Sequence, residues 1–319
     1  MSYYSNKARM SAGVGALIWL PFLLIRTSDS SETELLQKIL LLGVLVVVPL
    51  GLSLIPAQQD SDESLLYRLA VPAQPVAAVA VTVSFLFSPG APAAILVASW
   101  LLVSLVLALE GLKRLLSRSA LLSSELSIDA GLAYLVVGAV GLLASRLGIQ
   151  PMGFGDTIVL LTAVHFHFAG FAAPLLAGLA GRYVIRGSRQ RKILGLAIGF
   201  IVGGTPLVAA GITFSDVLGL VGTLVIATGL LLLAILVLGW VVTSQNTILA
   251  RTLLAISSLS SVFAMILASL YAYSLVVGTV ILDIPQMALS HGLLNSFGFT
   301  MCGLLGWWLV NLEHKQVQK

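Results

Sequence analysis

The sequence is a succession of long apolar runs separated by short polar segments. A helix needs about 20 apolar residues to cross the hydrocarbon core of a bilayer. Ten runs meet or approach this length, and they cover residues 11–25, 37–55, 72–87, 91–109, 127–145, 157–180, 193–213, 217–242, 253–281 and 286–310. Backbone polar groups in lipid must be paired internally, so such runs fold as α-helices. We therefore predict an all-α, polytopic transmembrane helix bundle that forms a single integral membrane domain over residues 1–319.

The scarcity of charged side chains supports this prediction. Hydrophobic residues make up 58% of the chain and charged residues only 9%, whereas about a quarter of the residues of an ordinary soluble domain are charged. This composition excludes a soluble enzyme, a nucleic-acid-binding protein and a disordered chain. We expect a multi-pass protein of the bacterial cytoplasmic membrane, with membrane lipids as partners and no nucleic acid. The sequence leaves the oligomeric state and any cofactor open.

The basic residues indicate an orientation for this bundle. With the N-terminus in the cytoplasm and ten alternating spans, 14 of the 17 Lys and Arg residues fall in cytoplasmic segments. The outer segments keep only Arg26, Lys38 and Arg146. The positive-inside rule describes this kind of skew. We therefore predict that both chain ends are cytoplasmic.

Two glycine patterns make local predictions. The third and fourth spans are separated only by Ser88-Pro89-Gly90, which is typical of a tight turn in a helical hairpin. In the seventh span Gly195, Gly199 and Gly203 repeat every four residues, a spacing that lets another helix approach closely. We therefore expect the seventh span to lie centrally in the bundle.

Three histidines lie within predicted spans, where ionisable side chains are costly and are the first place to look for function. His165 and His167 belong to the sixth span and His291 to the tenth. The helical rise of 1.5 Å per residue places His165 about 12 Å and His291 about 8 Å below the outer surface. Tyr271 and Tyr273 of the ninth span reach a similar depth, so polar groups of three helices share one level.

The helical repeat decides which of these side chains share a face. Residues two apart point about 200° away from each other, so His165 and His167 diverge. Asn295 lies one turn from His291. We predict an intramembrane pocket in which His165 or His167 meets His291 and Asn295, with the catalytic role of each unassigned. Further substrate contacts are expected from Thr162, Tyr271, Tyr273 and Asp129.

Carboxylates form a second group, and their positions indicate helix ends. Glu110, Glu125 and Asp129 fall toward the predicted cytoplasmic ends of the fourth and fifth spans, and Asp129 is the one expected to be buried. We predict no metal site, because two divergent histidines without nearby thiolates match no zinc or copper pattern. Haem ligation by two of the histidines is geometrically conceivable, but no motif supports it.

Two segments carry a family resemblance. Leu161-Thr-Ala-Val-His165-Phe-His167-Phe-Ala-Gly-Phe171, followed late in the chain by Ser290-His291-Gly-Leu-Leu-Asn295-Ser-Phe-Gly-Phe299, resembles the YndJ-like family of bacterial membrane proteins. The resemblance points to the same three histidines and Asn295 without giving them a role. It also implies that longer relatives carry a soluble C-terminal region, which is not expected in this chain after Lys319.

Two functions from different classes remain open. The first is a transporter of a small molecule, which the family resemblance favours and in which a histidine could couple transport to protons. The second is an intramembrane enzyme that acts on a lipid or isoprenoid by histidine acid–base catalysis, with Asn295 orienting the substrate. A purely structural role is the third and simplest interpretation of the histidines.

Overall fold

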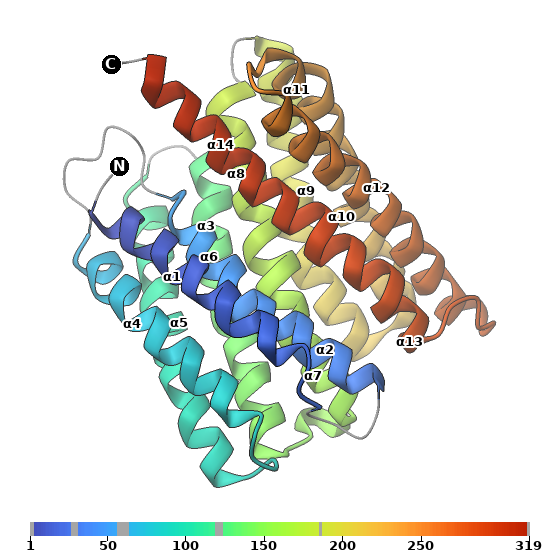
Figure 1. Ribbon diagram of the computed structural model, residues 1–319. Coiled ribbons are helices and arrows are strands. Elements are labelled where there is room, and N and C mark those ends of the chain that lie inside the picture. The colour runs from blue at the N-terminus through green and yellow to red at the C-terminus, as the bar shows by residue number, and fades with distance from the viewer. Residues whose placement is uncertain (1–2, 27–30, 56–63, 119–123, 185–186, 318–319) are drawn as a thin grey trace. The chain divides into compact units, whose positions relative to one another are not determined.

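The computed structural model describes residues 3–26, 31–55, 64–118, 124–184 and 187–317 (Figure 1). The described residues are 89% helical and contain no strand. By their internal contacts the residues divide into two compact units, described separately here. The first unit comprises Met1–Ser119 and Asp129–Ala172, and the second comprises Ala120–Ile128 and Ala173–Lys319.

Nine helices in the described ranges are long and apolar enough to cross a membrane. They are Glu32–Leu52, Leu65–Ser84, Ala91–Leu116, Ser124–Leu147, Asp156–Tyr183, Arg189–Phe214, Asp216–Ser244, Ile248–Val277 and Ile284–Glu313. They correspond to the second to tenth predicted runs, which confirms a polytopic helical membrane protein. The predicted first span, 11–25, is a 20-residue helix over Tyr3–Phe22 that is not among the nine.

The first unit contains the helices from the N-terminus to the middle of the chain. They are α1 (Tyr3–Phe22), α2 (Ser31–Leu42), η1 (Gly43–Val47), α3 (Val48–Leu52), α4 (Leu65–Ser84), α5 (Ala91–Leu116), most of α6 (Ser124–Leu147), η2 (Pro151–Gly153), α7 (Asp156–His165) and η3 (Phe166–Ala172). Helices α4 and α5 pack side by side, which confirms the predicted hairpin. Its turn ends at Gly90, whose φ of 151° requires glycine and whose N–H donates to the Arg146 carbonyl over 2.8 Å.

Helix α4 begins seven residues earlier than the apolar run that predicted it. Ser64 caps its first turn by accepting a hydrogen bond from the N–H of Tyr67 over 3.2 Å. The helix then continues through both Pro72 and Pro75, where the sequence interpretation began it. The two prolines therefore do not mark the start of α4. The helix packs against α1 and α5 along its length and is continuous through both prolines.

The second unit contains the first turn of α6 and the helices of the C-terminal half. They are α8 (Ala173–Val184), α9 (Ser188–Phe214), α10 (Asp216–Leu236), η4 (Val237–Val241), α11 (Val242–Ser244), α12 (Ile248–Val277), α13 (Ile284–Met287), η5 (Ala288–Gly292), η6 (Leu294–Met301) and α14 (Cys302–Val317). Helix α10 packs along α9 on one side and α12 on the other, and α12 packs against η6 and α14.

Within the second unit, no described helix packs closely on the glycine ladder of the seventh span. A Cβ atom added at Gly195, Gly199 or Gly203 would meet no atom within 4 Å, and the central position of this span in the bundle stays a prediction. The close approach of α9 to α10 uses other glycines instead. A Cβ on Gly211 would lie 2.1 Å from the Cα of Gly219. The four-residue repeat is present, but tertiary packing selects a different face of α9.

Five segments within the membrane-spanning helices are π-helical: η1, η3, η4, η5 and η6. A π-helix forms i→i+5 hydrogen bonds, is rare, and occurs frequently at functional sites. Segment η3 begins directly after His165 and contains His167. Segments η5 and η6 contain His291 and Asn295. Both histidine segments of the sequence therefore lie on irregular helical backbone, which periodicity did not predict.

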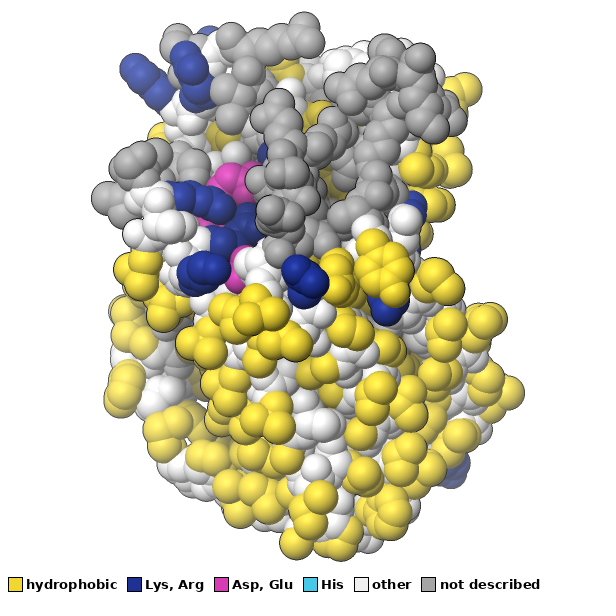
Figure 2. Space-filling view, turned by 90° about the vertical axis from the view of Figure 1, so that its left-hand side faces the viewer, with side chains coloured by type: hydrophobic (Ala, Val, Ile, Leu, Met, Phe, Trp, Pro, Cys, Tyr) yellow, Lys and Arg dark blue, Asp and Glu magenta, His cyan; other side chains and the backbone are white. Residues whose placement is uncertain are grey.

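The surface matches a membrane environment. Figure 2 shows one face on which hydrophobic side chains cover a broad area, while Lys and Arg side chains gather toward one end of it. Such a division into an apolar band and a basic end is typical of proteins that contact lipid tails and headgroups.

Candidate functional site

His291 and Asn295 meet within the second unit, one helical turn apart. Nδ1 of His291 lies 2.8 Å from the carbonyl oxygen of Ala264 on α12. A carbonyl only accepts, so Nδ1 carries the proton and donates. The Asn295 amide nitrogen lies 3.1 Å from Nε2 of the same ring and 3.1 Å from the His291 carbonyl oxygen. His291 is therefore held as the neutral Nδ1–H tautomer between α12 and an asparagine.

Serines continue this polar contact along α12. The hydroxyl of Ser257 donates to the Phe299 carbonyl of η6 over 2.7 Å. Ser260 lies against Gly298, where an added Cβ would come within 2.3 Å of its Oγ. The two helices thus approach closely through small residues and pair polar groups across their contact. We call the contact formed by Ser257, Ser258, Ser260, Ser261, Ala264, His291, Asn295, Gly298 and Phe299 the polar seam.

A small cavity lies at the inner side of this seam. It has a volume of about 20 Å³ and is lined by three of the serines, Ser257, Ser258 and Ser261, together with apolar residues that include Phe299 and Trp307. This is enough space for one water molecule. The Oγ1 atom of the neighbouring Thr300 is buried without a hydrogen-bond partner. A water-sized, mainly apolar space with three serines in its wall therefore exists inside a membrane-spanning part of the chain.

The predicted tyrosine contacts belong to the same unit but lie further along α12. Tyr271 is seven residues beyond Ala264, about 10 Å along the helix axis. The Tyr271 side chain is partly buried, whereas the Tyr273 side chain is more exposed, at 50%. Their contact with a substrate stays a prediction.

His167 belongs to the first unit and is fully buried. Its Nδ1 donates to the Ala163 carbonyl over 2.7 Å, and its Nε2 accepts the indole N–H of Trp100 over 3.0 Å. Glycines allow this fit: an added Cβ on Gly138 would lie 2.8 Å from Nδ1, and one on Gly43 would lie 3.3 Å from the histidine Cβ. Both ring nitrogens of His167 are engaged, so a haem iron or a further proton could bind to the ring only by displacing one of these hydrogen bonds.

His165 and Thr162 differ from His167 in exposure. The His165 side chain reaches the surface of the protein, and its Nδ1 donates to the Leu161 carbonyl over 2.8 Å. Thr162 is partly buried and donates to the Ile158 carbonyl of its own helix over 2.9 Å. His165 and His167 thus lie in different environments, as their spacing predicts. The predicted meeting of either one with His291 and Asn295 involves residues of both units and stays a prediction.

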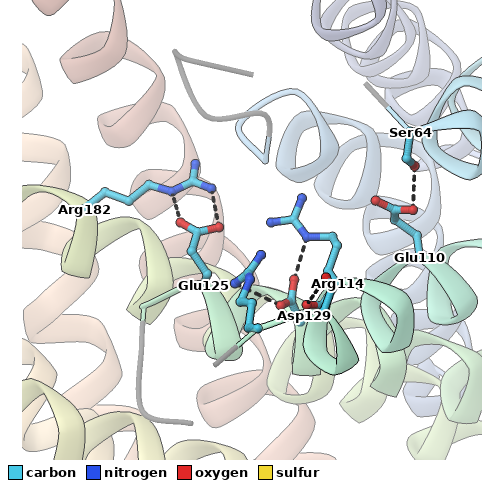
Figure 3. A network of polar contacts seen from close by, with 8 residues as sticks. Ser64, Glu110, Arg114, Glu125, Asp129 and Arg182 are labelled. Atoms are coloured by element: carbon cyan, nitrogen blue, oxygen red, sulfur yellow. Dashed lines mark hydrogen bonds and ion pairs between the residues drawn. The ribbon is translucent and has the colours of Figure 1, made fainter. Parts of the chain in front are cut away.

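Asp129 is buried, as the sequence predicts. Two arginines contact it, one in the last turn of α5 and one just after the end of that helix. Arg114 Nε lies 2.6 Å and Arg118 Nη1 3.0 Å from its two carboxylate oxygens (Figure 3). On the same stretch of chain, Glu110 is 4% exposed and accepts the hydroxyl of Ser64 over 2.5 Å. Within the first unit, these contacts join the start of α4 to the end of α5, and the end of α5 to α6 at Asp129. Asp129 is therefore placed as a structural anion, and its contact with substrate stays a prediction.

Glu125 makes a matching ion pair within the second unit. Its carboxylate accepts two hydrogen bonds from the Arg182 guanidinium of α8, at 2.6 and 2.9 Å (Figure 3). Bidentate pairs of this kind fix geometry as well as charge. Among the described residues, no group of three His, Cys, Asp or Glu side chains is arranged to hold a metal ion.

Comparison with known proteins identifies the family. Residues 38–299 match the family described as YndJ-like protein. The chain belongs to the YndJ-like family. A Bacillus subtilis (strain 168) relative described as "Uncharacterized membrane protein YndJ" is 31% identical over 303 residues, which cover 92% of this chain and 52% of the relative. The chain thus spans about half the length of this curated relative. No solved structure matches it.

The family match confirms the resemblance seen in the two histidine segments, and it makes the chain a multi-pass membrane protein. The sequence interpretation predicted tyrosines of α12 at the site, but it did not predict the contribution of the α12 serines or of Trp100. A signal for the first was present, because Ser257-Ser258-Leu259-Ser260-Ser261 is a serine cluster inside an apolar 30-residue helix. No local signal could have paired Trp100 with a histidine 67 residues away.

Proposed function

We propose that this YndJ-like protein moves a small polar molecule across the membrane along the polar seam of its second unit. The observation that carries the proposal is the combination of π-helical backbone and polar side chains at His291 and Asn295. Transporters form substrate sites on irregular membrane helices, because regular helices leave no backbone groups for a ligand. The serines extend these polar groups along α12, and three of them line one part of the water-sized cavity.

In this proposal Asn295 and His291 contact the solute directly. The Asn295 amide has both hydrogen-bond donors and an acceptor for the solute. When the solute binds, it replaces the Asn295 amide as the hydrogen-bond partner of Nε2 of His291. The Ala264 carbonyl keeps the ring oriented during this exchange. His167 acts only as packing in this proposal, since Trp100 and Ala163 occupy both of its nitrogens.

Access from water distinguishes a transport path from a dry helix contact. In a Cys302→Ser background, Asn295→Cys is treated with a charged, membrane-impermeant thiol reagent. The control is Phe297→Cys, two residues further along the helix and 39% exposed. We expect the charged reagent to modify Asn295→Cys and to leave Phe297→Cys unmodified. Equal protection of both cysteines would show that no aqueous path reaches the seam.

A second candidate, an intramembrane enzyme acting on a lipid, is favoured by one observation. The His165 side chain is exposed on a helix that is long and apolar enough to cross a membrane. A histidine there could reach a lipid by lateral diffusion and act as acid or base. This role would not need the polar seam.

One set of strains separates the two functions. Cells producing wild type, His291→Ala, Asn295→Ala or His165→Ala are compared by small-metabolite content and by lipid extract. Transport predicts altered metabolites in His291→Ala and Asn295→Ala with His165→Ala like wild type. Lipid chemistry predicts the converse, with the change confined to the lipid extract of His165→Ala. Wild-type behaviour of all three variants would overturn both functions.

A further inference from the structure

A leucine-lined groove lies on the surface of the first unit, where α4 begins and α5 ends. Its volume is about 610 Å³ and it is open to the outside. Its lining consists of Leu66, Leu109, Leu112, Lys113, Leu116 and Ser117. The α5 leucines recur at helical spacing along one face, and Leu109, Leu112 and Leu116 are 53%, 46% and 76% exposed. The groove therefore offers apolar surface that no described side chain covers.

Basic residues stand at the end of this apolar surface. Lys113 lines the groove and is exposed, and Ser117 follows it one turn later on the same face. Next to them, Arg114 and Arg118 share the single carboxylate of Asp129. Together with the buried carboxylate of Glu110 on the same helix, these charges balance, so Lys113 supplies the positive charge in excess. Anions are attracted to such a cluster, most strongly where the leucines exclude water.

We propose that this groove binds one anionic phospholipid, with an acyl chain along the leucines and the phosphate at Lys113 and Ser117. Leu109 and Leu112 precede Lys113 and Ser117 along α5, in the order in which a lipid presents its tail and its headgroup, and Leu116 lies between the two polar residues. Lys113 lies 22 residues after the first residue of α5, at the end of a membrane-spanning helix, where headgroups are found. The positive-inside rule assigns this end to the cytoplasmic leaflet, in which anionic lipids are available.

The apolar lining of the groove favours a lipid over a protein partner. An acyl chain needs no hydrogen bonds from the leucines, whereas an extended peptide backbone would be left unpaired against them. The proposal is independent of transport through the polar seam, which belongs to the other unit.

Native mass spectrometry of the full chain in detergent tests this site. Delipidated protein is titrated with dioleoyl phosphatidylglycerol and, separately, with dioleoyl phosphatidylcholine. We expect the wild type to take up one phosphatidylglycerol in preference to phosphatidylcholine. Lys113→Gln should lower that preference about fivefold, as loss of about 1 kcal/mol per basic residue near a membrane surface implies. Lys192→Gln, which removes an exposed lysine of α9, should retain it.

A groove variant that keeps the charge provides the second arm. Leu112→Trp fills the apolar part and should lower the uptake of both lipids, while its thermal unfolding remains that of the wild type. Equal binding of phosphatidylglycerol by Lys113→Gln and wild type would overturn the proposal. Competition by millimolar inorganic phosphate would identify a free anion as the ligand instead. Conversion of a dimer to a monomer by Leu112→Trp, with lipid uptake unchanged, would assign the groove to a second copy of the chain.

Discussion

The indole N–H of Trp100 donates a hydrogen bond to Nε2 of His167 across 3.0 Å, and both side chains are fully buried. The ring planes differ by only 18°, so the pair packs closely between α5 and η3. Because Nδ1 of the same ring donates to Ala163, the imidazole is neutral and fixed. A histidine that resembles a functional group in the sequence is therefore a satisfied component of the core.

Removal of the Trp100 indole N–H should destabilise the protein, and simultaneous removal of its partner His167 should recover part of that loss. Trp100→Phe leaves Nε2 of His167 buried without a partner, which costs about 1–3 kcal/mol. The double variant Trp100→Phe with His167→Leu should be more stable than the sum of the single effects predicts, with a coupling of about 1 kcal/mol. Unfolding in detergent measures these values. Trp240→Phe, at a 43% exposed position, is the control, and a Trp100→Phe variant as stable as this control would contradict the assignment.

Neutralisation of Asp129 should also weaken the first unit. Asp129→Asn leaves Arg114 and Arg118 facing each other, with side chains that are only 19% and 24% exposed. Breaking a fully buried pair costs about 3–5 kcal/mol, and partial exposure of the arginines reduces the expected loss to about 2 kcal/mol. Asp156→Asn, at an exposed helix start, should cost less than about 1 kcal/mol. Equal unfolding midpoints for the two variants would show that the carboxylate of Asp129 is dispensable.

A methyl group at Gly138 should disturb the histidine, whereas one at Gly199 should not. The added Cβ of Gly138→Ala would lie 2.8 Å from Nδ1 of His167, and overpacking of this kind costs about 1–3 kcal/mol. At Gly199 there is open space, so alanine should stabilise α9 by up to about 1 kcal/mol through its helix propensity. Thermal unfolding of the two variants in detergent provides the comparison. Unfolding of Gly138→Ala at or above the temperature of Gly199→Ala would refute the tight fit.

The orientation of the spans can be read by cysteine labelling of intact cells. In a Cys302→Ser background, Val280→Cys lies in a loop that we expect outside, and Asn246→Cys lies in a loop that we expect in the cytoplasm. Both positions are exposed. A membrane-impermeant maleimide should label Val280→Cys in intact cells and Asn246→Cys only after permeabilisation. The reverse pattern would invert the orientation derived from the basic residues.

Helix positions were predictable because hydrophobicity in a membrane acts on each segment separately. Nine of the ten predicted runs coincide with spanning-length helices, and the errors concentrate at helix ends, where polar turns extend beyond the apolar run. Helix α5 shows this extension: its apolar run ends at Leu109, but the helix continues to Leu116 through Glu110 and Lys113. Hydrogen bonding of Glu110 to Ser64 stabilises a turn that hydropathy alone leaves out.

The sequence by itself determined that this chain is a multi-pass helical membrane protein, that Asp129 is buried and that His165 and His167 diverge. These properties follow from local composition and the helical repeat. Only the tertiary structure decided that Trp100 satisfies His167, that Ala264 of α12 meets His291, and that α10 packs on a face of α9 other than its glycine ladder. Each of these depends on which helix faces lie against each other, and that choice is made by side-chain packing across long sequence separations.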